Sequence, residues 1–387
     1  MKRQRGFTLI ELMVSMSIVV SVVAIATDAL MQAEHVTNMV TYEANTQENL
    51  RAGMHFMVRD LMQAGEGIPQ GGISLPYTAT SAVNRPGTGT IFPNTYITLP
   101  AITPGSLTGQ LATSINPSTN AVLTGVATDI INIIYADNVL VDAAGNYLYS
   151  YPVAQPAPSI PVCAGTISAT GASVSLAPGC FTMPGVTNPI TAGNLIMFHN
   201  QNGTALQYVT SVAGQTINFS GGDPAGLNQT GKLNGTVANL ATTPGVFPPT
   251  TVTRVWMVTY YVDVTTPTDP QLIRQVNYPN YPAGNPVNPP TAIADDIENL
   301  GFSYAITSST DAVGTYPNGP GNAPTPVLPD TPAQIRAVNV FLAGRSENTY
   351  TAETTPTFLR NNLSTQVSIR SLSFTNQFQT SASQTAP

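Results

Sequence analysis

The hydrophobic positions of the chain begin with one nearly unbroken segment close to the N-terminus. The twenty residues from Phe7 to Ala26 are mostly Val, Ile, Leu, Met, Ala and Ser, and Asp28 follows after one further residue. A helix rises about 1.5 Å per residue, so a helix of this length spans the roughly 30 Å of hydrocarbon in a bilayer. The segment therefore predicts a membrane-spanning helix.

The same helix is predicted to continue well past the membrane, from about residue 7 to 64. No proline occurs before Pro69, and Gly65, Gly67 and Pro69 together mark a stop. Beyond the span, an apolar stripe with spacings of four, three and four is formed by Leu50, Met54, Met57 and Leu61, with Val58 and Met62 beside it. The polar residues assigned to the other faces are Arg51, His55, Arg59 and Asp60. This pattern is typical of a helix that packs one face on a globular domain.

Short apolar and alternating runs separated by turn residues fill the remainder, which predicts a loop-rich β domain. The predicted strands are 129–135, 138–141, 147–149, 194–199, 204–212, 216–219, 253–262, 272–276, 301–306, 335–342 and 365–374, with a short helix at 295–300. The strands at 194–199, 204–212 and 216–219 are interpreted as a three-stranded meander. Charged residues make up only 9% of the chain, while 42% are hydrophobic, so disorder is not the simplest interpretation.

The N-terminal segment carries an acid, Glu11, inside its apolar run, which is costly in a bilayer and usually marks a functional pairing. Three basic residues, Lys2, Arg3 and Arg5, precede Gly6, and the small residue lies before the apolar run rather than after it. A secretory signal is cut after its apolar region, so this segment is a different kind of signal. The basic residues predict a cytoplasmic N-terminus, with everything after Asp28 sent across the membrane.

This arrangement resembles the prepilin signal of type IV pilins and type II secretion pseudopilins, on the residues Gly6-Phe7-Thr8-Leu9-Ile10-Glu11. The resemblance implies that a prepilin peptidase cuts after Gly6 and that Phe7 becomes the N-methylated mature N-terminus. It also implies that Glu11 pairs with the free amine of a neighbouring subunit, which fits the rule that a buried charge is tolerable when it is paired. The alternative is that Glu11 snorkels to the nearby cytoplasmic face.

The second half of the chain resembles PilW-like minor pilins and J-type pseudopilins. The resemblance rests on an aromatic strand pair with an Arg-containing strand, a short acidic turn of helix before a Phe-x-Tyr strand, and a closing strand with alternating Arg, here 255–262 with Arg274, 295–304 and 367–374. It implies an α+β, pilin-like fold with a leader (1–6), a membrane half-helix (7–27), an amphipathic half-helix (28–65) and a β domain (66–387). Segments 71–127 and 278–290 are interpreted as insertions, and 314–332 as an exposed loop or linker.

The two cysteines, Cys163 and Cys180, lie in the exported region. A disulfide between them is predicted for an oxidising compartment and would contribute roughly 3 kcal/mol. Two free thiols are the alternative. A metal pair is disfavoured because no histidine is near in sequence.

The sequence contains few residues that suggest chemistry, and no enzyme activity or cofactor is predicted. His35, His55 and His199 are far apart in sequence, and the common catalytic and nucleotide-binding motifs are absent. The acids at 295, 296 and 298 could bind calcium, which is kept as an alternative. It is disfavoured because their spacing differs from that of an EF-hand. Nucleic-acid binding is disfavoured because the net charge is -7 and only 13 residues are Lys or Arg, three of them in the leader.

Together with these observations, the resemblance to PilW-like minor pilins implies a structural minor pilin of a type IV pilus that acts in pilus initiation or at the tip. The expected partners are other major and minor pilins, the prepilin peptidase, the inner-membrane assembly platform and, through the N-terminal helix, the membrane. The expected location is the bacterial inner membrane before assembly, then the periplasm and the cell-surface pilus. The alternatives are a type II secretion pseudopilin, a pilus-tip adhesin and an anchored inner-membrane enzyme.

Overall fold

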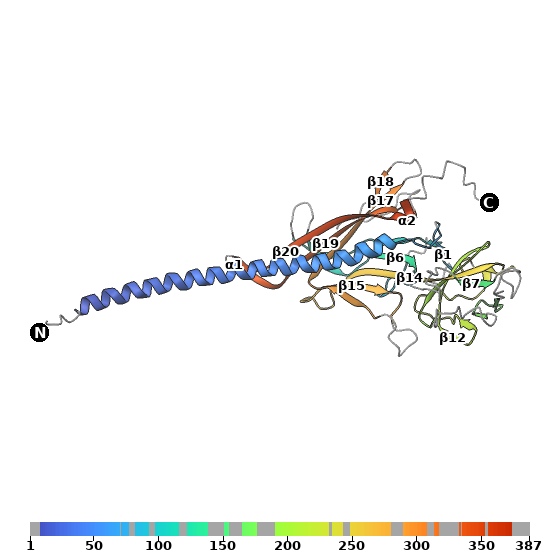
Figure 1. Cartoon of the computed structure of the whole chain (residues 1–387), viewed down its shortest axis with the longest axis horizontal. Helices are drawn as coiled ribbons and strands as arrows, with labels where there is room; N and C mark the ends of the chain where they lie inside the picture. The colour runs from blue at the N-terminus through green and yellow to red at the C-terminus, as the bar shows by residue number, and fades with distance from the viewer. Residues whose placement is uncertain are drawn as a thin grey trace, which may run out of the picture.

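A single long helix, α1 (Leu9–Gln63), dominates the computed structural model of the chain. The structure describes residues 8–69, 71–76, 82–92, 97–115, 122–137, 151–154, 165–175, 190–231, 234–242, 248–279, 289–307, 313–316, 333, 335–352 and 355–373. The N-terminal half of α1 projects as a bare rod and its C-terminal half lies against a β domain (Figure 1). The β domain is largely antiparallel, so the predicted α+β fold is confirmed and is consistent with a pilin-like fold.

The helix ends where the sequence predicts, since Gly65 and Gly67 adopt φ values of 78° and 69° that favour glycine. Four residues of the predicted stripe, Leu50, Met54, Met57 and Leu61, are at most 6% exposed and pack into one core with both large sheets. Arg51, His55 and Arg59 point to solvent as expected. Asp60, which was assigned with them to a face other than the apolar stripe, is instead fully buried.

The central sheet is organised around one long strand, β14 (Thr250–Asp263). One edge of β14 pairs with β10 and then β15, and the other edge pairs with β7 and then β6. The eight strands are β3 (Ile102–Gly105), β6 (Ile130–Ala136), β7 (Tyr151–Ala154), β10 (Leu195–Asn200), β11 (Gly203–Tyr208), β14, β15 (Gln271–Val276) and β16 (Thr291–Ala294). The predicted pairing of the aromatic strand with the Arg274 strand is therefore confirmed.

A second sheet of four antiparallel strands lies under α1. Its order is β18-β17-β19-β20, and the strands are β17 (Ile297–Thr307), β18 (Val313–Tyr316), β19 (Ile335–Ala352) and β20 (Thr355–Ser368). The predicted helix at 295–300 was wrong, because Asp295 and Asp296 form a bend between β16 and β17, with Asp296 at a φ of 58°. The predicted strand at 365–374 ends at Ser368, and a turn of helix, α2 (Arg370–Ser373), follows.

The predicted meander of 194–219 was also wrong, because its strands divide between two sheets. β11 pairs with β10 in the central sheet, whereas β12 (Ser211–Ala213) and β13 (Thr216–Asn218) belong to a four-stranded distal sheet with β8 (Thr166–Ile167) and β9 (Ser173–Ser175). The break follows Tyr208, where Val209 and Thr210 leave the strand. A short 3-10 helix, η1 (Val237–Leu240), packs in the distal core.

The 71–127 segment is part of the folded domain where the structure describes it. It supplies β3 to the central sheet and two separate antiparallel strand pairs, β1 (Ile73–Ser74) with β2 (Thr98–Leu99) and β4 (Leu111–Ile115) with β5 (Val122–Ala127). The buried guanidinium of Arg85 donates to Asn132 Oδ1 at 2.5 Å and to the Pro104 carbonyl at 2.7 Å. The predicted strands at 138–141 and 147–149, most of 278–290, 317–332, and both Cys163 and Cys180 lie outside the described residues.

Candidate assembly site

The first turn of α1 places Glu11 in a two-way cap with Thr8. Glu11 Oε2 accepts from the backbone N–H and the hydroxyl of Thr8, each at 3.0 Å, and the Glu11 N–H donates to Thr8 Oγ1 at 3.3 Å. This is a capping box, which the Thr-x-x-Glu spacing could have predicted. The carboxylate thus lies at the helix end where free backbone N–H groups favour an anion. Gly6 and Phe7 lie outside the described residues.

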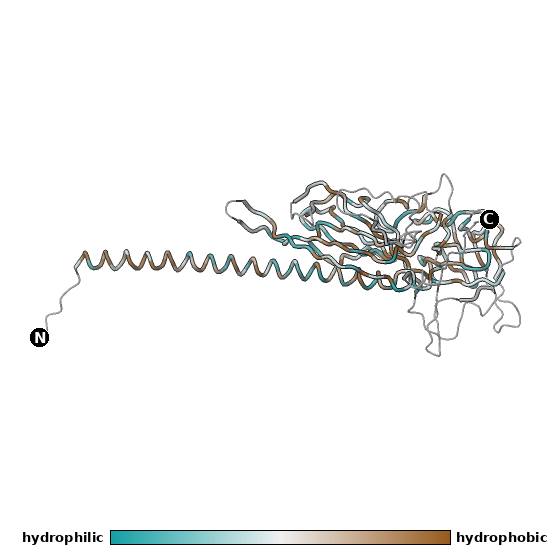
Figure 2. The backbone as a smooth tube through the Cα atoms, turned by 90° about the horizontal axis from the view of Figure 1, so that it is seen from above, coloured by the Kyte–Doolittle hydropathy of each residue, from teal (hydrophilic) through white to brown (hydrophobic). Residues whose placement is uncertain are grey.

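The apolar surface of the N-terminal half of α1 is exposed on every side. Leu9, Ile10, Met16, Ile25 and Met31 are between 65% and 77% exposed. Hydrophobic residues dominate the first turns of this rod (Figure 2), and the helix is long and apolar enough to cross a membrane. A surface of this kind needs a bilayer or other chains around it, because exposed apolar area on this scale is unfavourable in water.

A buried ion pair fastens the C-terminal half of α1 to the central sheet. Asp60 Oδ2 accepts from the Tyr260 hydroxyl and from Arg274 Nε, both at 2.6 Å, and Arg59 Nε lies 3.5 Å from Oδ1. Asp60 is fully buried and the Arg274 side chain is 18% exposed. Loss of one partner from such a pair leaves a buried charge, so the contact fixes the position of the helix on the sheet.

The negative charge at Asp60 also perturbs its neighbours. Burial raises the pKa of the Tyr135 hydroxyl to about 12, and the Asp60 carboxylate adds to this shift. Burial and the same carboxylate raise the pKa of Tyr260 well above its usual value. Burial alone would lower the pKa of Arg274, but the hydrogen bond and charge of Asp60 outweigh it and raise the pKa. Both tyrosines therefore stay neutral, and Tyr260 acts only as a donor to Asp60.

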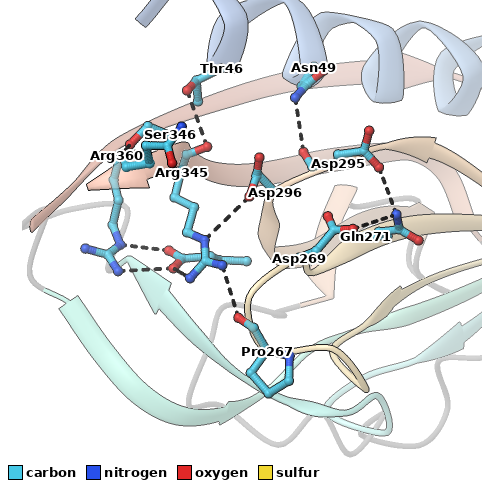
Figure 3. A network of polar contacts seen from close by, with 12 residues as sticks. Thr46, Asn49, Pro267, Asp269, Gln271, Asp295, Asp296, Arg345, Ser346 and Arg360 are labelled. Atoms are coloured by element: carbon cyan, nitrogen blue, oxygen red, sulfur yellow. Dashed lines mark hydrogen bonds and ion pairs between the residues drawn. The ribbon is translucent and has the colours of Figure 1, made fainter. Parts of the chain in front are cut away.

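A second polar cluster, which we call the root network, joins the base of the β19–β20 hairpin to β17 (Figure 3). Arg360 binds Glu298 through two hydrogen bonds of 2.7 Å and 3.1 Å. Arg345 lies 3.7 Å from both Glu298 and Asp296 and donates to the Pro267 carbonyl at 3.0 Å. Phe358 lies beside both guanidinium groups, with ring-centre distances of 4.2 Å and 5.7 Å. Bidentate pairs and stacked arginines of this kind set a fixed geometry.

The root network also contacts α1 and borders a polar pocket of about 540 Å³. Thr46 Oγ1 donates to the Arg345 carbonyl and Asn49 Nδ2 to the Asp295 carbonyl, each at 3.3 Å. The carboxylates that line the pocket are Glu48, Asp269, Asp295, Asp296 and Glu347. Burial raises the pKa of Asp296 to about 6; Arg345 opposes this rise, and Asp269, Glu347 and Asp295 add to it.

Among the described residues, no group of three or more His, Cys, Asp and Glu side chains is arranged to hold a metal ion. Two of the three acids considered for calcium, Asp296 and Glu298, are instead paired with arginines. His35 and His55 lie on α1, whereas His199 lies on β10. Sequence reasoning missed the roles of Thr8 and Asp60, and it considered Glu298 only as a calcium ligand. A lone acid beside an apolar stripe was the available signal for Asp60.

Comparison with known proteins gives a family match for the N-terminal segment only. Residues 1–27 match the family described as the prokaryotic N-terminal methylation motif. This match supports a type IV pilin-like protein with a structural role. No curated protein and no solved structure matches the chain. The matched motif implies contact with other pilins and with the prepilin peptidase, and the apolar helix fits membrane anchoring.

Proposed function

We propose that this chain is a PilW-like minor pilin that enters a type IV pilus through α1 and acts in pilus initiation or at the tip. The observation that carries the proposal is the methylation motif of residues 1–27, which includes the start of a 55-residue helix. The size of the β domain supports a minor role, because the resemblance implies that major pilins are shorter.

Within this proposal the chain divides into a leader (1–6), a membrane half-helix (7–27), a docked half-helix (28–65) and a β domain (66–387). The inner membrane holds the chain, with its N-terminus cytoplasmic, until the assembly platform adds it to the fibre. Glu11 then exchanges its cap to Thr8 for the free amine of a neighbouring subunit. Both partners stabilise the carboxylate, so the acid is paired before and after assembly.

Processing gives the first test. The mature chain is expected to begin at Phe7 with a methylated amine, as read by intact mass of membrane-extracted protein. Gly6→Val should block the cut and leave the chain in the inner membrane. A mature chain that keeps Met1, or one cut after Ala26, would contradict the proposal.

Assembly gives the second test. Glu11→Ala and Glu11→Gln should insert and be cut normally but be depleted in sheared pili relative to the membrane fraction. Asp28→Ala is the matched control, because it removes the exposed acid that follows the span. If both Glu11 variants enter pili like the wild type, helix packing alone drives assembly and the paired role of Glu11 is wrong.

Deletion of the chain separates the alternatives that share the same signal. A minor pilin predicts loss of surface pili, a pseudopilin predicts loss of secreted exoproteins, and a tip adhesin predicts loss of adhesion with pili intact.

Non-reducing peptide mapping of the exported protein should recover Cys163 joined to Cys180. Alkylation of both thiols without reduction would reject that disulfide.

A further inference from the structure

The β19–β20 hairpin extends beyond the sheet to which it belongs. β17 pairs with β19 only as far as Gly344, whereas β19 continues with β20 to Ala352. The part of β19 beyond Gly344, which pairs only with β20, reaches on the order of 20 Å past the end of its pairing with β17. We call residues 345–360 the ribbon. It reaches further toward the N-terminal end of α1 than the rest of the β domain (Figure 1).

The hydrogen-bonding direction of the ribbon follows from its register. The Leu359 N–H donates to the Ser346 side chain and the Ile369 N–H to the Arg336 carbonyl, so the backbone N–H and C=O groups of odd-numbered β20 residues point toward β19. The backbone groups of even-numbered residues, such as Phe358 and Pro356, point away from it. In an antiparallel pair, two residues that oppose each other either both point their backbone groups toward the partner strand or both point them away from it. Thr349 opposes Phe358 and Thr351 opposes Pro356, so the N–H and C=O groups of both threonines point to the outer edge of β19.

Among the strands that the structure describes, none occupies this outer edge at the place where β17 would continue. The Arg345 N–H, on the same edge, donates to the Asp296 carbonyl at 2.9 Å, and in the described part of the chain no strand pairs with β19 there beyond Gly344. Thr349 is exposed. A two-stranded hairpin is marginally stable alone, and an open strand edge is a template for another strand. The root network fixes the ribbon in place and leaves this edge free.

The vacant position begins at the acidic pocket. Five carboxylates line it, and Arg345 is the one basic side chain among its lining residues. Glu347, the first exposed residue of the ribbon, and Glu48 on α1 point to solvent there. A chain that enters beside Arg345 therefore meets a negative potential before it pairs with β19.

We propose that the edge of β19 at Thr349 and Thr351, with the acidic pocket at its root, docks an extended segment carrying Lys or Arg from a different subunit of the fibre. This inference rests on the proposed function. Backbone hydrogen bonds to the edge hold the segment, and the carboxylates select its basic side chain. A second copy of this chain is a poor match, because 20 acids outnumber 13 basic residues and three of those basic residues lie in the leader.

Site-specific photo-crosslinking of the full chain in cells tests the docking. A photoreactive phenylalanine in place of Thr349 should capture another pilin-like protein, whereas the same residue in place of Gln201, on the β10–β11 turn, should not. Thr349→Pro removes the outward N–H without removing a donor to β20, so incorporation into sheared pili should fall, while Thr349→Ala should incorporate like the wild type.

Charge reversal tests the pocket. Glu347→Lys should lower incorporation about tenfold, because like charges at an interface are strongly unfavourable. The double variant Gln201→Lys/Ser211→Lys changes the net charge equally at exposed distal positions and should incorporate normally. Wild-type chain missing from pili would reject the proposed function. Wild-type chain present in pili, with Glu347→Lys and Thr349→Pro incorporated equally well or with crosslinks only to its own copies, would overturn the docking inference alone.

Discussion

The two halves of α1 share one secondary structure but depend on different surroundings. In the N-terminal half, apolar side chains such as Leu9 and Ile25 are more than 70% exposed and surround the helix. In the C-terminal half, Leu50, Met57 and Leu61 are at most 2% exposed and lie along one stripe. The polar residues differ in the same way, since Glu11 is held by a local cap and Asp60 by strands far away in the sequence.

This contrast indicates that the two halves of one helix are suited to different environments. An all-round apolar surface suits a bilayer or a bundle of similar helices, whereas a one-sided stripe suits a sheet in water. The buried pair between Asp60 and Arg274 locks the second half to the β domain. A pull on the rod is therefore transmitted to the sheet, which is what a fibre subunit requires.

Removal of the buried acid should have the largest effect on the docked half. Asp60→Ala should lower the free energy of unfolding by about 3–5 kcal/mol, because it leaves Arg274 buried without its partner. Urea unfolding of the detergent-solubilised chain, followed by the fluorescence of its only tryptophan, Trp256, measures this. Asp28→Ala, in the bare half, should unfold like the wild type.

The double variant Asp60→Leu/Arg274→Met is the control for that result. It replaces the ion pair with apolar side chains and should recover most of the lost stability. Equal stability of Asp60→Ala and the wild type would mean that apolar packing alone docks the helix.

A close approach at Gly53 should give the next largest effect. A Cβ added there would lie 2.8 Å from Leu272 Cδ2 and 3.3 Å from Leu342 Cδ2. Gly53→Leu should therefore cost about 1–3 kcal/mol through overpacking. Ala33→Leu makes a similar change on the exposed half and should stay within about 0.5 kcal/mol. The comparison fails if both variants unfold at the same urea concentration.

The effect of pH on stability through the root network should be smaller than the effect of overpacking at Gly53. Burial raises the pKa of Asp296 from 3.8 to about 6, so the folded state holds a proton that the unfolded state releases. This contribution is complete below pH 3.8 and is lost as the pH rises through about 6. Between pH 7 and 5 the wild type should thus gain on the order of 2 °C in Tm relative to Asp296→Asn. Parallel pH profiles would contradict the shift. Asp129, whose pKa burial also raises to about 6, is common to both proteins.

The smallest effect should come from the bare half beyond the span. Val36 is 59% exposed, so Val36→Ser should change the stability of the β domain by less than about 0.5 kcal/mol. Met57→Ser makes the corresponding change at a fully buried position and should cost several times more. A large loss of stability in Val36→Ser would mean that the bare half contacts the domain.

Sequence periodicity predicted the helix, its stripe and most central strands well, because each depends on local spacing. It predicted the wrong partners for the strands after Tyr208 and the wrong element at 295–300. Acids before an apolar run suggest a helix start, but here Asp296 turns the chain between two strands and pairs with Arg345. Its partner lies 49 positions later in the numbering, and no local pattern reports such a pairing.

The sequence by itself determined the apolar helix, the methylation motif and the position of Glu11, because membrane insertion and signal recognition act on a short continuous segment. Only the tertiary structure decided that Asp60 is buried, that β14 joins four strands and that the ribbon projects with an outer edge that no described strand pairs. Burial and strand register depend on residues brought together from distant parts of the chain. The free energy of each such contact depends on its surroundings, which the spacing of residues along the chain does not contain.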